Sequence, residues 1–349
     1  MSTPVITADE LASYVVCPTR YAFEHVRPIS PRADHPDVTA DRRRALLADG
    51  LVAGLTAGVE SADARATIAA DRITERWPDT VGSYLNADQQ RFDGEILTAA
   101  VADYFERFGA AHAAGLVETD PVLGSEFDGT RYETAVDAVV ETDGCYRALR
   151  FLPTLQGTPP SWKDEGLVRE YVSRSAFYPR QIGHLLRAWT AIRGLLSTYG
   201  MDADVEFTYV SLFDDVAVSY GAGGDRAAST PSASVTLQQF GALFESEREE
   251  IRALLRDLGP KLLDGEYAVP EADRSLIAEE CCGFCPYQDG CPESIRSDLT
   301  VADRDWDRVG SGGNQIGDGG NQVDGRGNRP IQEDRSTADR DRAVREDDS

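Results

Sequence analysis

The sequence predicts an α/β protein in which a small mixed sheet is flanked by helices. Long stretches carry apolar residues at helical spacing, most clearly over residues 180–199. Two runs rich in β-forming residues, 132–141 and 145–152, flank the hairpin turn signal Asp143-Gly144. Four of the six cysteines lie close together near the end of the part that is expected to fold, which indicates a metal or cluster site.

The amino-terminal part is predicted to be helical. A short helix over residues 8–26 is followed by a polar, proline-containing loop over 30–41. Residues 42–115 contain three amphipathic stretches with breaks near Glu60 and Pro78, and we interpret them as a helical insertion.

Beyond the predicted hairpin, strand and helix patterns alternate, and the strand that carries Asp137 is expected near the centre of the sheet. This alternation is typical of an α/β core. The expected elements are a loop with Gly157, Pro159 and Pro160, a helix over 180–199, strands over 205–213 and 216–220, a loop over 221–234 and a helix over 237–263.

The last part of the chain differs in composition from the rest. From about residue 308 it consists mostly of Gly, Asn, Asp, Arg and other polar residues. Such a segment buries too little apolar surface to offset the entropy of ordering it. We therefore predict one folded domain over residues 1–300 and an acidic, Gly/Asp/Arg-rich disordered tail over 301–349.

The chain is strongly acidic, with 60 Asp and Glu against 35 Lys and Arg and a net charge of -25. Lys163 and Lys261 are its only lysines. Carboxylates hold hydration water, whereas lysine stems expose apolar surface, so this composition is typical of a halophilic, archaeal protein that stays solvated in concentrated salt. At molar salt the Debye length is about 3 Å, so the net charge neither excludes nor supports nucleic-acid binding.

The sequence gives no sign of a membrane or export function. Residues 1–10 lack the basic start and apolar core of a signal peptide, and no apolar run reaches membrane-spanning length. We therefore expect a cytoplasmic protein with no membrane partner. Thiols stay reduced in the cytoplasm, so clustered cysteines indicate a metal rather than a disulfide.

The late cysteines have the spacing of metal ligands. Two residues separate Cys282 from Cys285 and five separate Cys285 from Cys291, with glycines and prolines that allow tight turns. A fourth ligand must come from elsewhere, and Cys17 is the candidate, which would tie the amino terminus to the end of the folded part. Four thiolates suit either zinc or an iron–sulfur cluster, and the spacing alone does not decide between them.

Two cysteines are left over. Cys281 is interpreted as a bystander within the patch over residues 281–292, although a ligand register of Cys281 and Cys285 remains open. Cys145 lies in a predicted strand and is interpreted as a small core residue. Inert, buried thiols are disfavoured as a reading of the patch because so many cysteines share so short a span.

Taken together, Cys17-Pro-Thr-Arg-Tyr and the C-x2-C-x5-C spacing resemble the iron–sulfur branch of the PD-(D/E)XK nuclease superfamily. That branch includes the CRISPR-associated spacer-trimming exonucleases, the nuclease domain of AddB and the RecB-like nuclease part of the eukaryotic replication helicase–nuclease. The resemblance covers about residues 8–296. It implies a restriction-endonuclease-like core and a 4Fe-4S cluster held by Cys17, Cys282, Cys285 and Cys291.

The resemblance also implies an active site, from which this chain departs. Glu126 and Asp137 match the two carboxylates that hold Mg²⁺ or Mn²⁺ in an active member. On the partner strand, Arg150 and Leu152 stand at the carboxylate and lysine positions of the D/E-x-K motif. A guanidinium brings a permanent positive charge to the place of the cation, and leucine removes the amine that orients water. We therefore expect weak or absent nuclease activity.

At the other active-site positions of the family, this chain matches some residues and departs from others. The histidine position falls near Ala53 or Gly54, and Gln181 fits the helix glutamine, but Leu185 stands where tyrosine is expected. His184, beside Gln181, is interpreted as an ordinary helix histidine, with a substituted site residue as the alternative. An active enzyme with a rearranged site of Glu126, Asp137 and Lys163 is also an alternative, although a solvated loop lysine is favoured for Lys163.

The resemblance implies a DNA-associated function in repair, recombination or foreign-DNA processing. The expected ligand is single-stranded DNA or DNA ends, and the expected partner is a helicase or an active nuclease subunit. A redox- or iron-sensing scaffold that uses the cluster and binds no nucleic acid is the alternative from another functional class.

Overall fold

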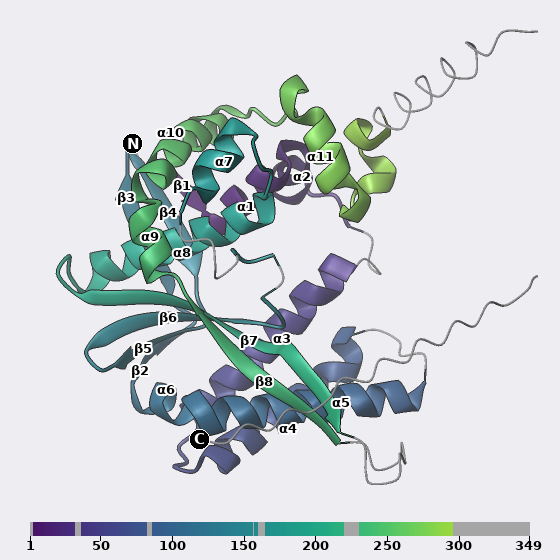
Figure 1. Ribbon diagram of the computed structural model, residues 1–349, viewed down its shortest axis with the longest axis vertical. Helices are drawn as coiled ribbons and strands as arrows, with labels where there is room; N and C mark the ends of the chain where they lie inside the picture. Colours follow the sequence, from purple (N-terminus) through teal and green to yellow (C-terminus); the bar gives the residue numbers. More distant parts are fainter. Residues whose placement is uncertain are drawn as a thin grey trace, which may run out of the picture. The chain divides into compact units, whose positions relative to one another are not determined.

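The computed structural model describes residues 3–31, 36–81, 86–155, 157–159, 165–219 and 230–295 (Figure 1). The chain divides into two units, Met1–Val301 and Ala302–Ser349, and every described residue belongs to the first. The tail predicted over 301–349 lies outside the described residues. In the described part of the chain, no helix combines the length and apolar character needed to cross a membrane.

The first unit is an α/β structure with two sheets flanked by helices, which confirms the predicted class at that level. The smaller sheet has the order β1-β4-β3 and the larger sheet the order β2-β5-β6-β7-β8. In the larger sheet β6 and β7 are parallel and the other pairs antiparallel, so this sheet is mixed. The strands are β1 (Val5–Thr7), β2 (Leu116–Thr119), β3 (Val122–Phe127), β4 (Thr130–Ala135), β5 (Ala138–Thr142), β6 (Cys145–Leu152), β7 (Asp204–Ser219) and β8 (Thr230–Gln239).

Helices cover both faces of the larger sheet (Figure 1). Helices α3, α4 and α5 pack with one face, while α1, α7, α8 and α10 share a second core with the other face. The α-helices are α1 (Ala8–Val16), α2 (Pro18–Tyr21), α3 (Pro36–Thr56), α4 (Ala62–Val81), α5 (Ala87–Tyr104), α6 (Ala110–Ala114), α7 (Leu167–Ser173), α8 (Pro179–Tyr199), α9 (Gly241–Ser246), α10 (Arg248–Asp264) and α11 (Arg274–Glu280). Single π-helical turns, η1 (Ala22–Val26) and η2 (Phe105–Gly109), extend α2 and α5.

The predicted hairpin is present, but the strand before it is divided. Asp143 and Gly144 have φ values of 54° and 78°, as a two-residue hairpin turn requires, and they join β5 to β6. The run over residues 132–141 does not form one strand, because β4 and β5 belong to different sheets. Between the end of β4 and the start of β5, Val136 N–H donates to Pro121 O and Asp137 N–H donates to Leu149 O. The division therefore places Asp137 at the junction of the two sheets.

Helix α8 is the crossover between the parallel strands β6 and β7 and has the apolar stripe that the sequence predicts. The buried residues of that stripe are Ile182, Leu185, Leu186, Trp189, Ile192 and Leu195. Gly183 lets α8 approach α1 closely, because a Cβ at this position would lie 2.9 Å from the Cβ of Ala12. This close packing brings the polar side chains of α1 and α8 together beside the sheet.

Several predicted boundaries are wrong. Helix α3 begins at Pro36, so the loop expected over 30–41 is shorter, and proline is well suited to a first helical turn. The break near Glu60 is present between α3 and α4, and the break predicted near Pro78 follows Val81, because α4 continues through the proline. Burial of the large Trp77 side chain on α4 shows that packing outweighs the local signal of the proline.

The carboxy-terminal half differs from the predicted elements more than the amino-terminal half does. The strands expected over 205–213 and 216–220 form one strand, β7, with a register shift between Ser211 and Asp215. Strand β8 occupies the end of the loop expected over 221–234 and the start of the helix expected over 237–263. Small polar residues form β8 because β7 offers an unpaired edge, which is a long-range cause. The sequence did not predict β1, β2, β3, α7 or α11.

Buried His112 makes the stability of this unit dependent on pH. Its Nδ1 lies 2.9 Å from the hydroxyl of Tyr104, and burial followed by Arg147 lowers its pKa to about 4. The folded state therefore holds His112 neutral, while the unfolded chain takes up a proton near pH 6.5. Stability is complete above about pH 6.5 and decreases as the pH falls toward 4, by up to about 3 kcal/mol.

Urea unfolding of the wild type and of His112→Gln between pH 7.5 and 4.5 measures this contribution. We expect the free energy of unfolding to depend less steeply on pH in the variant. His25→Gln is the control, because the side chain of His25 is 30% exposed. Identical pH dependence in His112→Gln and the wild type would contradict the prediction.

Candidate functional site

The amino-terminal cysteine lies at a break between α1 and α2. Because Pro18 disfavours helical geometry in the residue before it, Cys17 is extended, with φ -166° and ψ 120°, and the helix predicted over 8–26 is interrupted there. Burial raises the pKa of the Cys17 thiol to about 12, although the backbone N–H groups of Arg20 and Thr19 donate toward its sulfur. The break therefore turns a buried sulfur and nearby donors toward the carboxy-terminal segment.

The late cysteines follow α11 on two tight turns. The 3-10 turns η5 (Cys282–Phe284) and η6 (Gln288–Gly290) each end at a cysteine with extended backbone. Cys285 N–H donates to Cys282 O at 3.1 Å, and Cys291 N–H donates to Gln288 O at 3.3 Å. The two spacings in the sequence thus correspond to two successive turns.

The structure brings Cys17 together with the late cysteines. One small apolar cavity is lined by Cys17, Cys282, Cys285 and Cys291, and also by Cys281. We call it the thiol cavity. Among the described residues, no three His, Cys, Asp or Glu side chains form a group that could hold a single metal ion. A zinc site needs every sulfur about 2.3 Å from one point, whereas a cluster spreads its thiolates over several irons.

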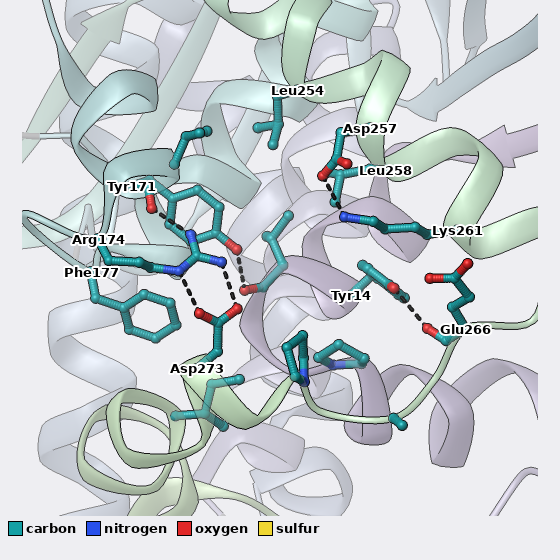
Figure 2. A pocket seen from close by; sticks show the side chains of 16 residues that line it. Tyr14, Tyr171, Arg174, Phe177, Leu254, Asp257, Leu258, Lys261, Glu266 and Asp273 are labelled. Carbon is teal, nitrogen blue, oxygen red and sulfur yellow. Dashed lines mark hydrogen bonds and ion pairs between the residues drawn. The ribbon is translucent and has the colours of Figure 1, made fainter.

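Contacts outside the thiol cavity fix the chain that leads to the cysteine segment, residues 281–291, to the core (Figure 2). Arg174, just after α7, binds both carboxylate oxygens of Asp273 at 2.7 and 2.6 Å, and its guanidinium lies 4.8 Å from the ring centroid of Tyr171. The hydroxyl of Tyr14 on α1 donates to Glu266 O at 2.7 Å. The first contact holds the chain between α10 and α11 against the end of α7, and the second holds it against α1, which ends next to Cys17.

Asp137 is buried and is held by a guanidinium. Arg44 Nη1, from α3, lies 3.1 and 3.3 Å from the two carboxylate oxygens, and Phe151 N–H donates to Oδ2 at 2.6 Å. The side chain is 9% exposed. Both oxygens of Asp137 are therefore occupied by protein donors.

Of the other predicted catalytic residues, Glu126 is described, and it does not join Asp137. Glu126 is exposed on β3 and lies opposite Arg131 on β4. The part of β4 from Arg131 to Ala135 spans about 13 Å, and Asp137 lies two residues further along the chain. Lys163 lies outside the described residues. The described residues therefore do not place the predicted carboxylates around a Mg²⁺ or Mn²⁺ ion.

A second carboxylate near Asp137 was not singled out from the sequence. Asp120 follows β2, has a positive φ of 52°, and donates its N–H to Asp137 O at 3.1 Å. Burial and the charge of Asp137 raise the pKa of its carboxyl, while Arg44 lowers it. Because β2 was not predicted, the sequence offered no reason to place Asp120 beside Asp137.

A second cavity, of about 650 Å³, lies next to the cysteines. It is lined from α1, α2, η1, α3, β6 and α8, and also by Pro31, Pro286 and Tyr287. We call it the arginine cavity, because its basic lining residues are Arg20, Arg44, Arg150, Arg180 and Arg187. Leu152, at the lysine position of the family motif, also lines it. The predicted motif positions thus face a basic cavity.

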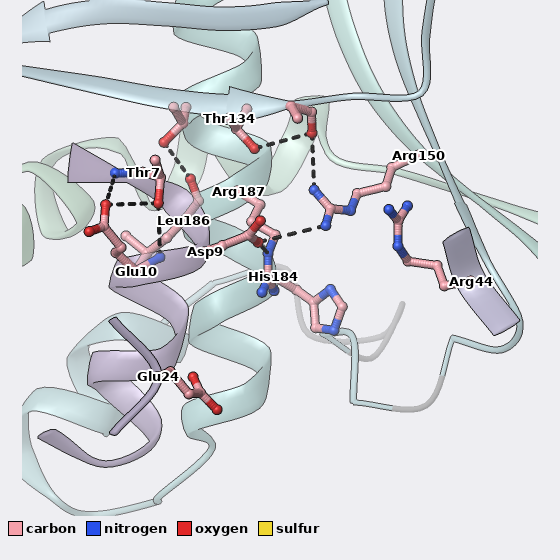
Figure 3. Close-up of polar contacts among 12 residues, drawn as sticks. Thr7, Asp9, Glu10, Glu24, Arg44, Thr134, Arg150, His184, Leu186 and Arg187 are labelled. Carbon is pink, nitrogen blue, oxygen red and sulfur yellow. Dashed lines mark hydrogen bonds and ion pairs between the residues drawn. The ribbon is translucent and has the colours of Figure 1, made fainter. Parts of the chain in front are cut away.

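Asp9 lies among these guanidiniums (Figure 3). Its Oδ1 accepts a hydrogen bond from Arg187 Nε at 2.6 Å and lies 3.6 Å from Arg150 Nη2. Burial raises the pKa of Asp9, but Arg187 and Arg150 outweigh it and lower the pKa to about 2. Arg150 also donates to Ala135 O at 3.0 Å. The carboxylate is therefore firmly ionised and bridges two arginines.

The pKa of His184 also responds to the positive charge of these arginines. Burial, Arg187 and Arg150 lower its pKa well below the usual value, so the imidazole is neutral. Its Nδ1 is buried and has no hydrogen-bond partner among the described residues. Arg180, His184 and Arg187 are spaced four and three residues apart, which places them on one face of α8. That spacing was a signal in the sequence that could have identified this face.

The candidate site thus consists of two adjoining cavities, one lined by cysteines and one by arginines. Val16 and Arg20 line both. The functional argument rests on these cavities, because no protein-family model, no curated protein and no solved structure matches this chain.

Proposed function

We propose that this chain is a nuclease-like protein of the PD-(D/E)XK type that holds a 4Fe-4S cluster and binds DNA. The observation that carries the proposal is the meeting of Cys17 with Cys282, Cys285 and Cys291 at one cavity, beside a basic cavity at the expected active site. Four Cys thiolates at one cavity are the ligand set of a 4Fe-4S cluster.

The arrangement of the sheet supports this reading. An antiparallel hairpin, β5–β6, is followed by the crossover helix α8 and by β7 parallel to β6. The order of these elements is consistent with a restriction-endonuclease-like core in which the D/E-x-K positions lie on β6. A fold alone does not fix a function, so the cavities carry the functional argument.

Cys17, Cys282, Cys285 and Cys291 would hold the cluster. Backbone N–H groups support the thiolate form at two of them, from Arg20 and Thr19 toward Cys17 and from Tyr287 toward Cys285. When bound, the cluster supplies a covalent link between the two ends of the unit. Its main role in this proposal is to hold α1 and the cysteine segment together around the arginine cavity.

The residues present do not fit a catalytic Mg²⁺ or Mn²⁺ ion. Arg44 occupies the carboxylate of Asp137, and Arg150 and Leu152 replace the second carboxylate and the lysine. A divalent cation placed there would be repelled by fixed positive charge. We therefore assign DNA binding without ordinary hydrolysis, in repair, recombination or foreign-DNA processing, beside a helicase or an active nuclease subunit.

The proposal is tested with protein purified without oxygen and a short labelled single strand of DNA. We expect a mobility shift in EDTA that weakens as salt rises, and no cleavage above background with Mn²⁺. Cleavage that disappears in Asp137→Ala would favour the active enzyme instead. Failure to shift single-stranded, duplex or end-containing DNA would favour a redox- or iron-sensing scaffold.

A further inference from the structure

The arginine cavity reverses the charge balance of the chain. Carboxylates outnumber basic residues by 60 to 35 in the whole sequence, but five arginines and three carboxylates line this cavity. The side chains of Arg150, Arg187 and Arg44 are only 11%, 20% and 26% exposed. Arginines are seldom buried to this degree unless they are paired or bind something.

In the described contacts, two carboxylates serve these three guanidiniums, and the charge of Asp41 acts on Arg187 as well. Asp9 is shared between Arg150 and Arg187, and Asp137 serves Arg44. Burial, followed by the charges of Arg187 and Arg44, lowers the pKa of Arg150, whereas Asp9 raises it. An anion entering the cavity would relieve the mutual repulsion of these cations.

The geometry and size of the cavity identify the anion. A guanidinium presents parallel N–H donors that match phosphate oxygens, and the protein contacts described above leave other donors of Arg44 and Arg187 available. A volume of about 650 Å³ is that of an ordinary small-ligand pocket, so a nucleotide or two can enter but a duplex cannot. The rings of His25 and Tyr287 in the lining suit stacking with bases.

We infer that the arginine cavity binds a phosphate group of a single DNA strand without a divalent metal, through the guanidiniums that line it. The inference deepens the proposed function, on which the choice of DNA as the source of the phosphate rests. A strand terminus or an internal phosphodiester supplies the same chemistry.

The test measures the affinity of anaerobically purified protein for a short single strand by fluorescence anisotropy in EDTA. Strands with a 5′-phosphate and a 5′-hydroxyl are compared, and inorganic phosphate is titrated separately by calorimetry. Arg150→Gln and Arg180→Gln are each expected to weaken binding about tenfold. Arg91→Gln is the matched control, because its side chain is 69% exposed on α5, and about a twofold change or less is expected.

The outcomes separate this inference from the proposed function. Arginine-dependent binding that needs the 5′-phosphate identifies a terminal phosphate, and arginine-dependent binding of both strands identifies an internal one. DNA binding unaffected by Arg150→Gln and Arg180→Gln would overturn the inference and leave the proposed function standing. Arginine-dependent binding of inorganic phosphate without DNA binding would support the cavity and contradict the proposed function. Binding of neither ligand would overturn both.

Discussion

Replacing Cys17 by alanine is expected to abolish the brown colour and the visible absorption of protein purified without oxygen. Cys17 is the only cysteine outside the carboxy-terminal segment that lines the thiol cavity. The late ligands Cys282, Cys285 and Cys291 would then lack a fourth thiolate at the position of Cys17. Because cofactor binding and folding are coupled, the variant should also unfold at a lower temperature than the wild type. Absorption spectra and iron content of the two proteins, purified in parallel, measure the effect.

Two other cysteines make the experiment specific. Cys145 is buried in β6 and does not line the thiol cavity, so Cys145→Ala should keep the full absorption. Cys281 lines the cavity beside Cys282, and Cys281→Ala decides the ligand register. Retained absorption makes Cys281 a bystander, whereas loss assigns the register of Cys281 and Cys285. Unchanged absorption in Cys17→Ala would contradict a ligand role for Cys17.

Replacing Arg44 by methionine is expected to lower the free energy of unfolding by about 2–4 kcal/mol, because it leaves the buried carboxylate of Asp137 without its counter-ion. Adding Asp137→Asn should recover much of the loss, since the amide oxygen can still accept from Phe151 N–H. Urea unfolding of the single and double variants measures both effects.

The control is a similar ion pair on the surface. Arg72 binds Asp49 at 2.9 Å, but the two side chains are 46% and 39% exposed, so Arg72→Met should cost about 1 kcal/mol or less. Mn²⁺ should leave the melting temperature of the wild type unchanged, because Asp137 already has a cation. A stabilising shift with Mn²⁺, or an Arg44→Met variant as stable as the wild type, would show that Asp137 is available to a metal.

Local features of the fold could be predicted from the sequence. The Asp143-Gly144 turn has a strong local conformational preference, and the stripe on α8 follows from its helical period. The meeting of Cys17 with the late cysteines was an expectation from spacing and resemblance, and these residues line one small cavity. In each case a short stretch of sequence carries the signal.

The other features of the fold and of the site depend on contacts between segments that are distant in the sequence. Strand β8 forms from small polar residues because β7 pairs with it, and β4 leaves the run over 132–141 because it pairs with β1 and β3. The arginine cavity draws on α1, α3, β6 and α8, which no local pattern connects. Arg44 could not be matched to Asp137 from the sequence, because the helix that carries it packs on the sheet only through tertiary contacts.

Iron and acid-labile sulfide analysis of the wild-type protein, purified without oxygen and compared with its zinc content, tests the convergence of the thiols most directly. A cluster held by Cys17, Cys282, Cys285 and Cys291 predicts roughly four irons and four sulfides per chain and little zinc. One zinc per chain with no sulfide, or no metal at all in protein that is folded and stable, would contradict it.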